Sequence, residues 1–288
     1  MISDRYIAGD DLADACRVVE RLNAAGKMAT VDVLGEEIHN ADEAEAIAGE
    51  YRDVFETIDR ESLDSNVSVK LTALGLKLGY ELCRRNLESV VREAAERGNF
   101  VRIDMEDSTT TDDTLRLYRE LREAGLDNVG VVLQARLRRS LRDVHALADL
   151  QPNVRLCKGI YLEPELIAYQ GFEEIREHFV RVLEELVKGG SYVAIATHDD
   201  DLLQQGKRLV AEAGLGRDDY EFQMLLGVRP PLGDRLVLDG HRLRIYVPYG
   251  NQWYAYSLRR LQENPKIAGY IAADTLGRLV PGGNGRPL

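Results

Sequence analysis

Four polar side chains fall on one face of a helix expected near the carboxyl end of the chain. They are Tyr256, Arg259, Arg260 and Glu263, within the segment YVPYGNQWYAYSLRRLQE that begins at Tyr246. At about 100° per residue, these four positions share an arc of roughly 100°. Two adjacent guanidinium groups can hold a carboxylate through paired, charge-assisted hydrogen bonds, so this face predicts an anion-binding site. Taken alone, a solvated face with one ion pair between Arg259 and Glu263 is the simpler interpretation.

The order of the predicted strands and helices along the chain favours the anion-binding interpretation over the solvated one. Short apolar strands are predicted at residues 28–36, 67–72, 100–106, 128–135, 154–161, 192–199, 221–226 and 242–248. Helical periodicity is predicted at residues 10–26 and 40–60 and between the later strands, most weakly at residues 227–240. Apolar strands that alternate with amphipathic helices are typical of a parallel sheet covered by helices. Eight such units in 288 residues favour a (β/α)8 barrel of the TIM type, with an open doubly wound sheet as the alternative.

Polar side chains gather where the predicted strands end, which is where such barrels place their active sites. They are Glu36, Lys70, Asp104, Glu106, Gln134, Arg155, Lys158, Thr197, His198, Gln223 and Tyr246. Each alone could be a satisfied polar residue of the barrel, but together they indicate a ligand. Cations outnumber carboxylates among them once Arg259 and Arg260 are included, which favours an anionic ligand. A metal site is not expected, because His198 has no second histidine at ligand spacing.

Composition restricts the class of protein further. The formal net charge of −12 argues against a nucleic-acid partner and against binding to anionic lipid. No run of 18 apolar residues occurs, and the first residues do not resemble a signal peptide. We therefore expect a cytoplasmic protein with at most peripheral membrane contact at the inner face. Without a linker-like segment, residues 1–288 are predicted to form one domain, with a short helix at about 10–26 and a tail at about 280–288.

Several longer motifs occur in a characteristic order. They are VSVKLTALG, FVRIDMEDS, VGVVLQARL, VRLCKGIYLEPE, IATHD, EFQMLLGV, RIYVPYG and YSLRRLQEN. Together they resemble the flavin-dependent proline dehydrogenases, in particular the single-function bacterial or archaeal type and the corresponding domain of bifunctional proline utilization proteins. The resemblance runs from Tyr6 to about Asn264.

This resemblance implies a distorted (β/α)8 barrel with non-covalently bound FAD. It implies oxidation of L-proline to Δ1-pyrroline-5-carboxylate, the first step of proline catabolism, by hydride transfer from C5 of proline to N5 of the flavin. The electrons would pass to a quinone. A functional link to a pyrroline-5-carboxylate dehydrogenase is also expected.

The resemblance also implies a role for individual residues. The residues that bind substrate or close the site over it are Glu36, Lys70, Tyr256, Arg259 and Arg260. The residues closest to the chemistry are Asp104, Arg155 and Tyr246, with Arg155 beside the flavin N5. The residues that line the flavin are Met105, Gln134, Arg155, Lys158, Gly159, Ile160, Thr197, His198, Gln223, Leu225 and Glu263.

Three alternatives remain at this point. The same barrel without flavin could form a Schiff base on Lys70 or Lys158 with a carbonyl substrate. A related flavoenzyme could act on hydroxyproline or another cyclic amino acid, since a pocket rejects one added hydroxyl only modestly. A protein that binds flavin or an amino acid without turnover is the third.

Overall fold

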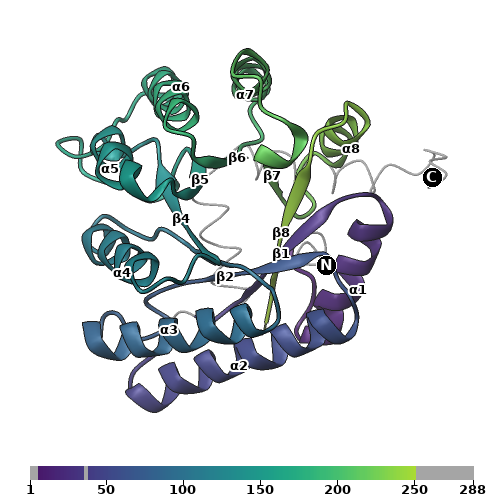
Figure 1. The fold of residues 1–288 in the computed structure, drawn as a ribbon, viewed down its shortest axis with the longest axis vertical. Helices are drawn as coiled ribbons and strands as arrows, with labels where there is room; N and C mark the ends of the chain where they lie inside the picture. The colour runs from purple at the N-terminus through teal and green to yellow at the C-terminus, as the bar shows by residue number, and fades with distance from the viewer. Residues whose placement is uncertain (1–5, 36–37, 251–288) are drawn as a thin grey trace, which may run out of the picture.

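The computed structural model describes residues 6–35 and 38–250, which form a closed barrel of parallel strands surrounded by helices (Figure 1). The strands are β1 (Met28–Val33), β2 (Ser65–Val69), β3 (Val101–Ile103), β4 (Val129–Gln134), β5 (Asn153–Cys157), β6 (Tyr192–Ala196), β7 (Tyr220–Leu225) and β8 (Leu243–Tyr249). Each strand pairs with the next along the chain, and β8 pairs with β1 from Met28 opposite Arg244 to Val33 opposite Tyr249. The predicted (β/α)8 barrel is confirmed, and the open sheet is excluded because the two end strands pair.

Helix α1 (Leu12–Ala24) precedes β1, and the connections between the strands contain the other helices. They are α2 (Ala41–Arg60), α3 (Tyr80–Glu96), α4 (Thr111–Glu123), α5 (Ser140–Leu147), α6 (Phe172–Lys188), α7 (Asp200–Glu212) and α8 (Pro230–Leu238). Short 3-10 turns at Ala148–Leu150 and Arg217–Asp219 precede β5 and β7. The weakly predicted α8 does form, and it begins at Pro230, where a missing N–H breaks no helical hydrogen bond. The helix predicted after β8 lies outside the described residues.

Five strands end earlier than the sequence suggests. They end at Val33 (β1), Val69 (β2), Ile103 (β3), Cys157 (β5) and Ala196 (β6), whereas the apolar pattern predicted ends at residues 36, 72, 106, 161 and 199. The polar residues that follow these strands therefore lie on the loops at the carboxyl end of the barrel.

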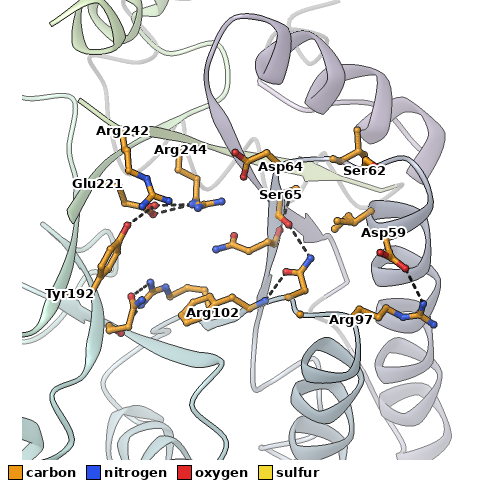
Figure 2. Close-up of a pocket in the computed structure, with 17 residues that line it drawn as sticks. Asp59, Ser62, Asp64, Ser65, Arg97, Arg102, Tyr192, Glu221, Arg242 and Arg244 are labelled. Atoms are coloured by element: carbon orange, nitrogen blue, oxygen red, sulfur yellow. Dashed lines mark hydrogen bonds and ion pairs between the residues drawn. The ribbon is translucent and has the colours of Figure 1, made fainter. Parts of the chain in front are cut away.

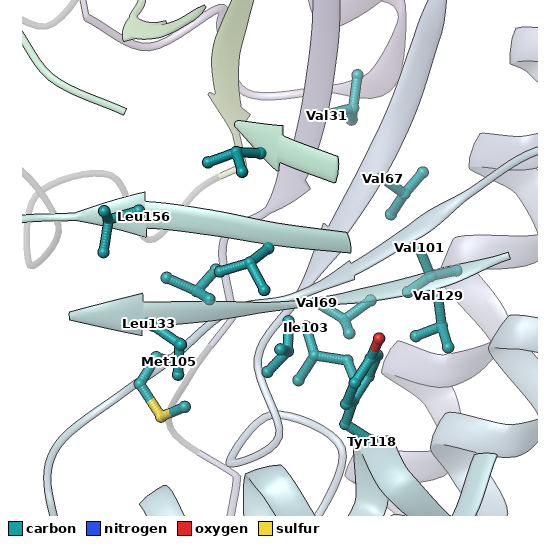
Figure 3. Close-up of a cluster of buried hydrophobic side chains, with 14 of the residues drawn as sticks. Val31, Val67, Val69, Val101, Ile103, Met105, Tyr118, Val129, Leu133 and Leu156 are labelled. Atoms are coloured by element: carbon teal, nitrogen blue, oxygen red, sulfur yellow. The ribbon is translucent and has the colours of Figure 1, made fainter. Parts of the chain in front are cut away.

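The side chains of β2 show how the strands separate two environments. Val67 and Val69 lie in a buried apolar cluster with Tyr118 of α4, between the barrel and its helices (Figure 3). Ser68 and Lys70 alternate with these valines and therefore face the barrel interior. Barrel interiors of this type are usually filled by branched apolar residues. Here the interior is largely polar, which indicates a functional site inside the barrel.

Within residues 6–35 and 38–250, no helix combines the length and the apolar character needed to cross a membrane.

Candidate active site

A buried lysine joins two aspartates inside the barrel. Lys70 directly follows β2, and its Nζ donates to both carboxylate oxygens of Asp32 on β1 at 2.8 Å. The same nitrogen lies 3.5 Å from Oδ2 of Asp104, which follows β3. It also lies 3.2 Å from the hydroxyl oxygen of Tyr246 on β8. Four strands that are distant in sequence therefore place these polar groups in one buried cluster.

Arg155 on β5 extends this cluster across the barrel. Its Nη1 donates to Oδ1 of Asp104 at 2.6 Å, and its Nε donates to Oε1 of Gln223 on β7 at 2.6 Å. The Tyr246 hydroxyl donates to Oδ2 of Asp104 at 2.7 Å, so both oxygens of this carboxylate accept strong hydrogen bonds. The guanidinium carbon of Arg155 also lies 5.2 Å from the centroid of the Tyr246 ring, a cation–π distance. Asp104 is thus held rigidly between Arg155 and Tyr246.

The two aspartates differ in their tendency to ionise. Burial raises the pKa of Asp32 to about 6, and the attraction of Lys70 opposes this rise only in part. Burial also acts to raise the pKa of Asp104, but Arg155 and then Lys70 outweigh it, so the pKa of Asp104 is lowered. Asp104 is therefore ionised at neutral pH, whereas Asp32 titrates close to neutrality. Carboxylates with such separated pKa values are typical of functional sites.

The loops after β5 and β6 carry a second charged group. Lys158 Nζ donates to Oδ2 of Asp199 at 2.8 Å, and Arg176 of α6 donates to both oxygens of Asp199 at 2.8 and 2.6 Å. Although burial raises the pKa of Asp199, the hydrogen bonds from Arg176 and Lys158 lower it to about 2. Two cations therefore share the Asp199 carboxylate. Arg176 also pairs with Asp201 at 2.8 Å, so carboxylates balance the positive charge at this edge of the barrel mouth.

Gly159, beside Lys158, occupies a position that only glycine fits. Its φ angle is +94°, and a Cβ atom there would lie 2.6 Å from Oε1 of Gln134. Gln134 is itself fixed, since its Nε2 donates to the carbonyl of Glu106 at 2.8 Å. The backbone after β5 thus approaches the buried amide of Gln134 closely.

His198 has a defined tautomer in this arrangement. Its Nε2 accepts the backbone N–H of Leu225 at 2.9 Å, so in the neutral ring the proton is on Nδ1. Thr197 is buried next to it, and its hydroxyl oxygen accepts the N–H of Asp199 at 3.2 Å. The end of β6 therefore presents a buried hydroxyl group and an oriented imidazole ring.

The structure brings together most of the predicted site residues that it describes. One hydrogen-bonded network contains Lys70, Asp104, Arg155, Gln223 and Tyr246. The others lie on the adjoining loops and strand ends, namely Gln134, Lys158, Gly159, Ile160, Thr197, His198 and Leu225. The Met105 side chain packs instead in the apolar cluster outside the strands (Figure 3), and only its carbonyl lies near the Gln134 amide, at 3.4 Å. Five predicted residues lie outside the described part of the chain, namely Glu36, Tyr256, Arg259, Arg260 and Glu263.

Sequence reasoning missed two members of the network. Asp32 is fully buried and holds Lys70, and Ser68 donates to Oδ1 of Asp104 at 2.8 Å. A charged residue inside the apolar segment MATVDV was the available indication for Asp32. With Asp32 included, the expected excess of cations is not present in the central cluster of the described residues, because Lys70 and Arg155 face two carboxylates. An anionic ligand there would depend on Arg259 and Arg260.

Comparison with known proteins supports one family. The model of the family described as Proline dehydrogenase matches residues 15–272. Proline dehydrogenase 1 of Bacillus subtilis subsp. natto is 39% identical over 267 residues, which are 93% of this chain and 88% of that protein. Proline dehydrogenase of Deinococcus radiodurans is 37% identical over 279 residues, which are 96% of this chain and 90% of that protein.

A solved structure agrees with these matches. It is proline utilization A (PutA) from Bdellovibrio bacteriovorus inactivated by N-propargylglycine, with a TM-score of 0.85 and 26% identity. The similarity covers 91% of this chain but 32% of that chain, so this chain spans about a third of the PutA protein. The motif resemblance, the barrel and these matches agree, and the chain belongs to the proline dehydrogenase family.

Proposed function

We propose that this protein catalyses the FAD-dependent oxidation of L-proline to Δ1-pyrroline-5-carboxylate, with hydride transfer from C5 of proline to N5 of the flavin. The observation that carries this proposal is the network of Lys70, Asp104, Arg155 and Tyr246 at the carboxyl end of a barrel of the proline dehydrogenase family. It combines a fixed cation for a carboxylate with a guanidinium group and a phenol in one buried cluster.

Lys70 has the position expected of a carboxylate anchor. Its ammonium group is buried and oriented by Asp32 at 2.8 Å, so little rotamer entropy remains to be lost when a ligand binds. We propose that Arg259 and Arg260 complete the anchor with forked hydrogen bonds. Three fixed cations would orient the pyrrolidine ring and direct C5 towards the flavin, which is catalysis by positioning.

Asp104 is suited to organise the site electrostatically. Its lowered pKa keeps it ionised at neutral pH, and both of its oxygens already accept hydrogen bonds. A carboxylate in this state is a weak base, so we assign it the orientation of Lys70 and the stabilisation of positive charge on the substrate nitrogen. Removal of a hydride from C5 needs the lone pair of the neutral amine, which forms the new C=N bond.

The residues around the network fit FAD in their chemistry. Family members are generally flavin-dependent, and FAD, when bound, supplies the hydride acceptor at N5. Arg155, Gln134 and Gln223 offer hydrogen-bonding groups for the polar edge of a flavin ring. The cations at Lys158 and Arg176 and the close backbone approach at Gly159 suit a phosphate-bearing chain. We propose that these residues hold the cofactor.

The further partners are part of the same proposal. We infer that a quinone reoxidises the flavin, that contact with the membrane is at most peripheral, and that the product passes to a pyrroline-5-carboxylate dehydrogenase. The negative net charge of −12 supports a cytoplasmic location without broad adhesion to anionic lipid.

The contacts of Lys70 disfavour the Schiff-base alternative. A nucleophilic lysine must be deprotonated, whereas the two contacts of Lys70 with Asp32 at 2.8 Å stabilise its ammonium form. Lys158 is similarly held by Asp199 at 2.8 Å. Borohydride in the presence of a carbonyl compound should therefore trap neither lysine.

An anaerobic visible spectrum tests the proposal directly. The purified protein should show flavin bands that bleach when L-proline is added. Arg259→Lys and Arg260→Lys should raise the KM for proline by roughly tenfold or more, because a point charge cannot replace a forked contact. Arg208→Lys is the control, because this exposed arginine lies on α7 and pairs with Glu212. A protein that stays colourless after incubation with FAD, or a flavin that proline leaves oxidised, would overturn the proposal.

A further inference from the structure

The amino end of the barrel contains a pocket with a volume of about 500 Å³. Its lining residues lie at or near the beginnings of the strands, for example Ser65 of β2 and Arg244 of β8 (Figure 2), whereas the candidate active site lies where the strands end. The polar residues that line it include Asn66, Arg102, Tyr192, Glu221, Arg242 and Arg244. A volume of this size is typical of small-molecule sites, which span roughly 300 to 1,000 Å³.

Arg102 is the most unusual residue of this pocket. Its side chain is 2% exposed. Nη1 donates to the carbonyls of Val131 and Asn153 at 3.0 and 2.7 Å, and Nη2 donates to the side-chain oxygen of Asn153. In the described part of the chain, Nε has no hydrogen-bond partner, and no carboxylate forms an ion pair with this guanidinium group. A buried cation without a counter-charge is energetically costly.

The neighbouring strand is shaped to accommodate this cation. Gly130 on β4 lies beside the guanidinium group, and a Cβ atom there would be 2.5 Å from Nη1 of Arg102. Any larger residue would displace the arginine or the backbone of Asn153, since the same Cβ would lie 2.7 Å from its carbonyl oxygen. The absence of a side chain at Gly130 therefore makes room for the guanidinium group of Arg102 at the amino end of the barrel.

Two further arginines leave the pocket with an excess of positive charge. Arg244 pairs with the buried Glu221 at 3.0 Å, and Tyr192 donates to the same carboxylate at 3.1 Å (Figure 2). Arg242 contacts Asp218 at 3.4 Å, but Asp218 is 92% exposed, so this pair is weak. Three guanidinium groups thus face one buried carboxylate.

Other charges nearby do not cancel this excess. At the rim, Asp59 faces Arg97 at 3.8 Å, and Asp64 is the remaining carboxylate of the lining. Burial, and then the proximity of Arg155, lowers the pKa of Arg102 to about 9. An anion in the pocket would supply the missing counter-charge.

We propose that this pocket binds a small organic dianion, such as a phosphate ester or a dicarboxylate, through Arg102, Arg242 and Arg244. Guanidinium groups recognise both ligands through the same paired contacts to two oxygens. Phe100, Ile58 and Leu63 line the pocket as well and offer apolar contact for the carbon skeleton. The anion site does not depend on the proposed catalytic function. One hydrogen bond connects the two regions, because Nε2 of Gln223 in the network around Asp104 donates to Oε1 of Glu221 at 2.5 Å.

Titration calorimetry on the FAD-loaded protein tests this site with two probes, inorganic phosphate and succinate, at constant ionic strength set with sodium chloride. Saturable binding of at least one probe is expected, and the stronger probe identifies the ligand class. Arg242→Gln should weaken binding by about tenfold or more, because it removes one charge-assisted contact. Glu221→Gln should strengthen binding, because it releases Arg244 from its competing carboxylate. Arg208→Gln, which removes an exposed cation on α7, should change nothing.

Opposite effects of the two pocket variants separate a ligand site from a structural role. A residue that only supports the fold would weaken binding or stability in both variants. Lys158→Gln controls for anions that bind at the other end of the barrel. The proposal is overturned if neither probe saturates, if Arg242→Gln and Glu221→Gln leave binding unchanged, or if only Lys158→Gln abolishes it.

Discussion

Replacement of Asp32 by asparagine should make the protein more stable at neutral pH and less active. Burial raises the pKa of Asp32 from its ordinary value of 3.8 to about 6 despite the nearby Lys70. A carboxyl group with a raised pKa in the folded state contributes stability that is fully present below about 3.8 and is lost as the pH rises through about 6. The difference corresponds to about 3 kcal/mol, and roughly half of it is lost between pH 5 and pH 7.

Asparagine keeps the shape of the side chain but carries no charge. Lys70 would retain Asp104 at 3.5 Å and the Tyr246 hydroxyl at 3.2 Å, so its ammonium group would not be left uncompensated. The Asp32→Asn protein should therefore exceed the wild type by about 2 to 3 kcal/mol at pH 7 and converge with it towards pH 4. Its KM for proline should rise, because the two contacts at 2.8 Å by which the Asp32 carboxylate orients Lys70 are lost. Stability exchanged for function in this way is common at active sites.

Urea unfolding at several pH values between 5 and 7.5 measures the difference between the two proteins, and steady-state kinetics measures the KM. The competing view treats the pair of Asp32 and Lys70 as a stabilising buried ion pair. On that view, the same substitution would cost about 3 to 5 kcal/mol at pH 7. A variant that is less stable than the wild type at pH 7, or a stability difference that does not change with pH, would refute our reasoning.

Three further substitutions test other contacts. Asp199→Asn should cost about 2 kcal/mol at pH 7 in thermal unfolding, because the pKa of Asp199 is lowered to about 2. Stability from a lowered pKa is present above about 4 and is lost as the pH falls, so the wild type and Asp199→Asn should converge in acid. Gly159→Ala should reduce the ratio of bound flavin to protein, measured by absorbance, since its Cβ would lie 2.6 Å from Oε1 of Gln134; unchanged flavin content would contradict this. Tyr246→Phe should lower kcat/KM by about tenfold through the lost hydrogen bond to Asp104, and an unchanged value would exclude a role for the hydroxyl.

The barrel was predictable because the sequence of each strand and helix carries its own pattern of apolar and capping residues. The strand at residues 129–134 is apolar up to Gln134, and the strand at residues 220–225 alternates large apolar residues with Glu221 and Gln223. Helix α2 begins after Asn40, whose side chain accepts the N–H of Glu43 as an N-cap. The early ends of β3, β5 and β6 were not predictable in this way. Residues such as Met105 and Ile160 are still apolar although the hydrogen-bonded strand has already ended. The end of a strand is set by its pairing with the neighbouring strands, which the pattern of one strand does not report.

The candidate site was predictable as a set of strand ends but not as a network. Lys70, Asp104 and Arg155 were identified by type and position, whereas their partners depend on the register of the closed barrel. Asp32 lies opposite Ser68 in the pairing of β1 with β2, and only this register places the Asp32 carboxylate beside Lys70. The environment of Arg102 was not predictable either, because the sequence shows only an arginine within an apolar strand.

The barrel interior thus contains a buried guanidinium group at each end, and the two groups differ in whether a carboxylate neutralises them. At the carboxyl end, Arg155 meets Asp104 at 2.6 Å and the charges balance. At the amino end, Arg102 has no such partner in the described residues, and its pKa is lowered by burial and by Arg155. The two guanidinium groups therefore repel each other across the interior. Because binding at two coupled sites is reciprocal, an anion held by Arg102 should weaken this repulsion and make the positive charge of Arg155 less costly. We therefore expect the reduction potential of the flavin to shift when an anion saturates the pocket at the amino end. An unchanged potential would show that Arg102 and Arg155 are electrostatically independent.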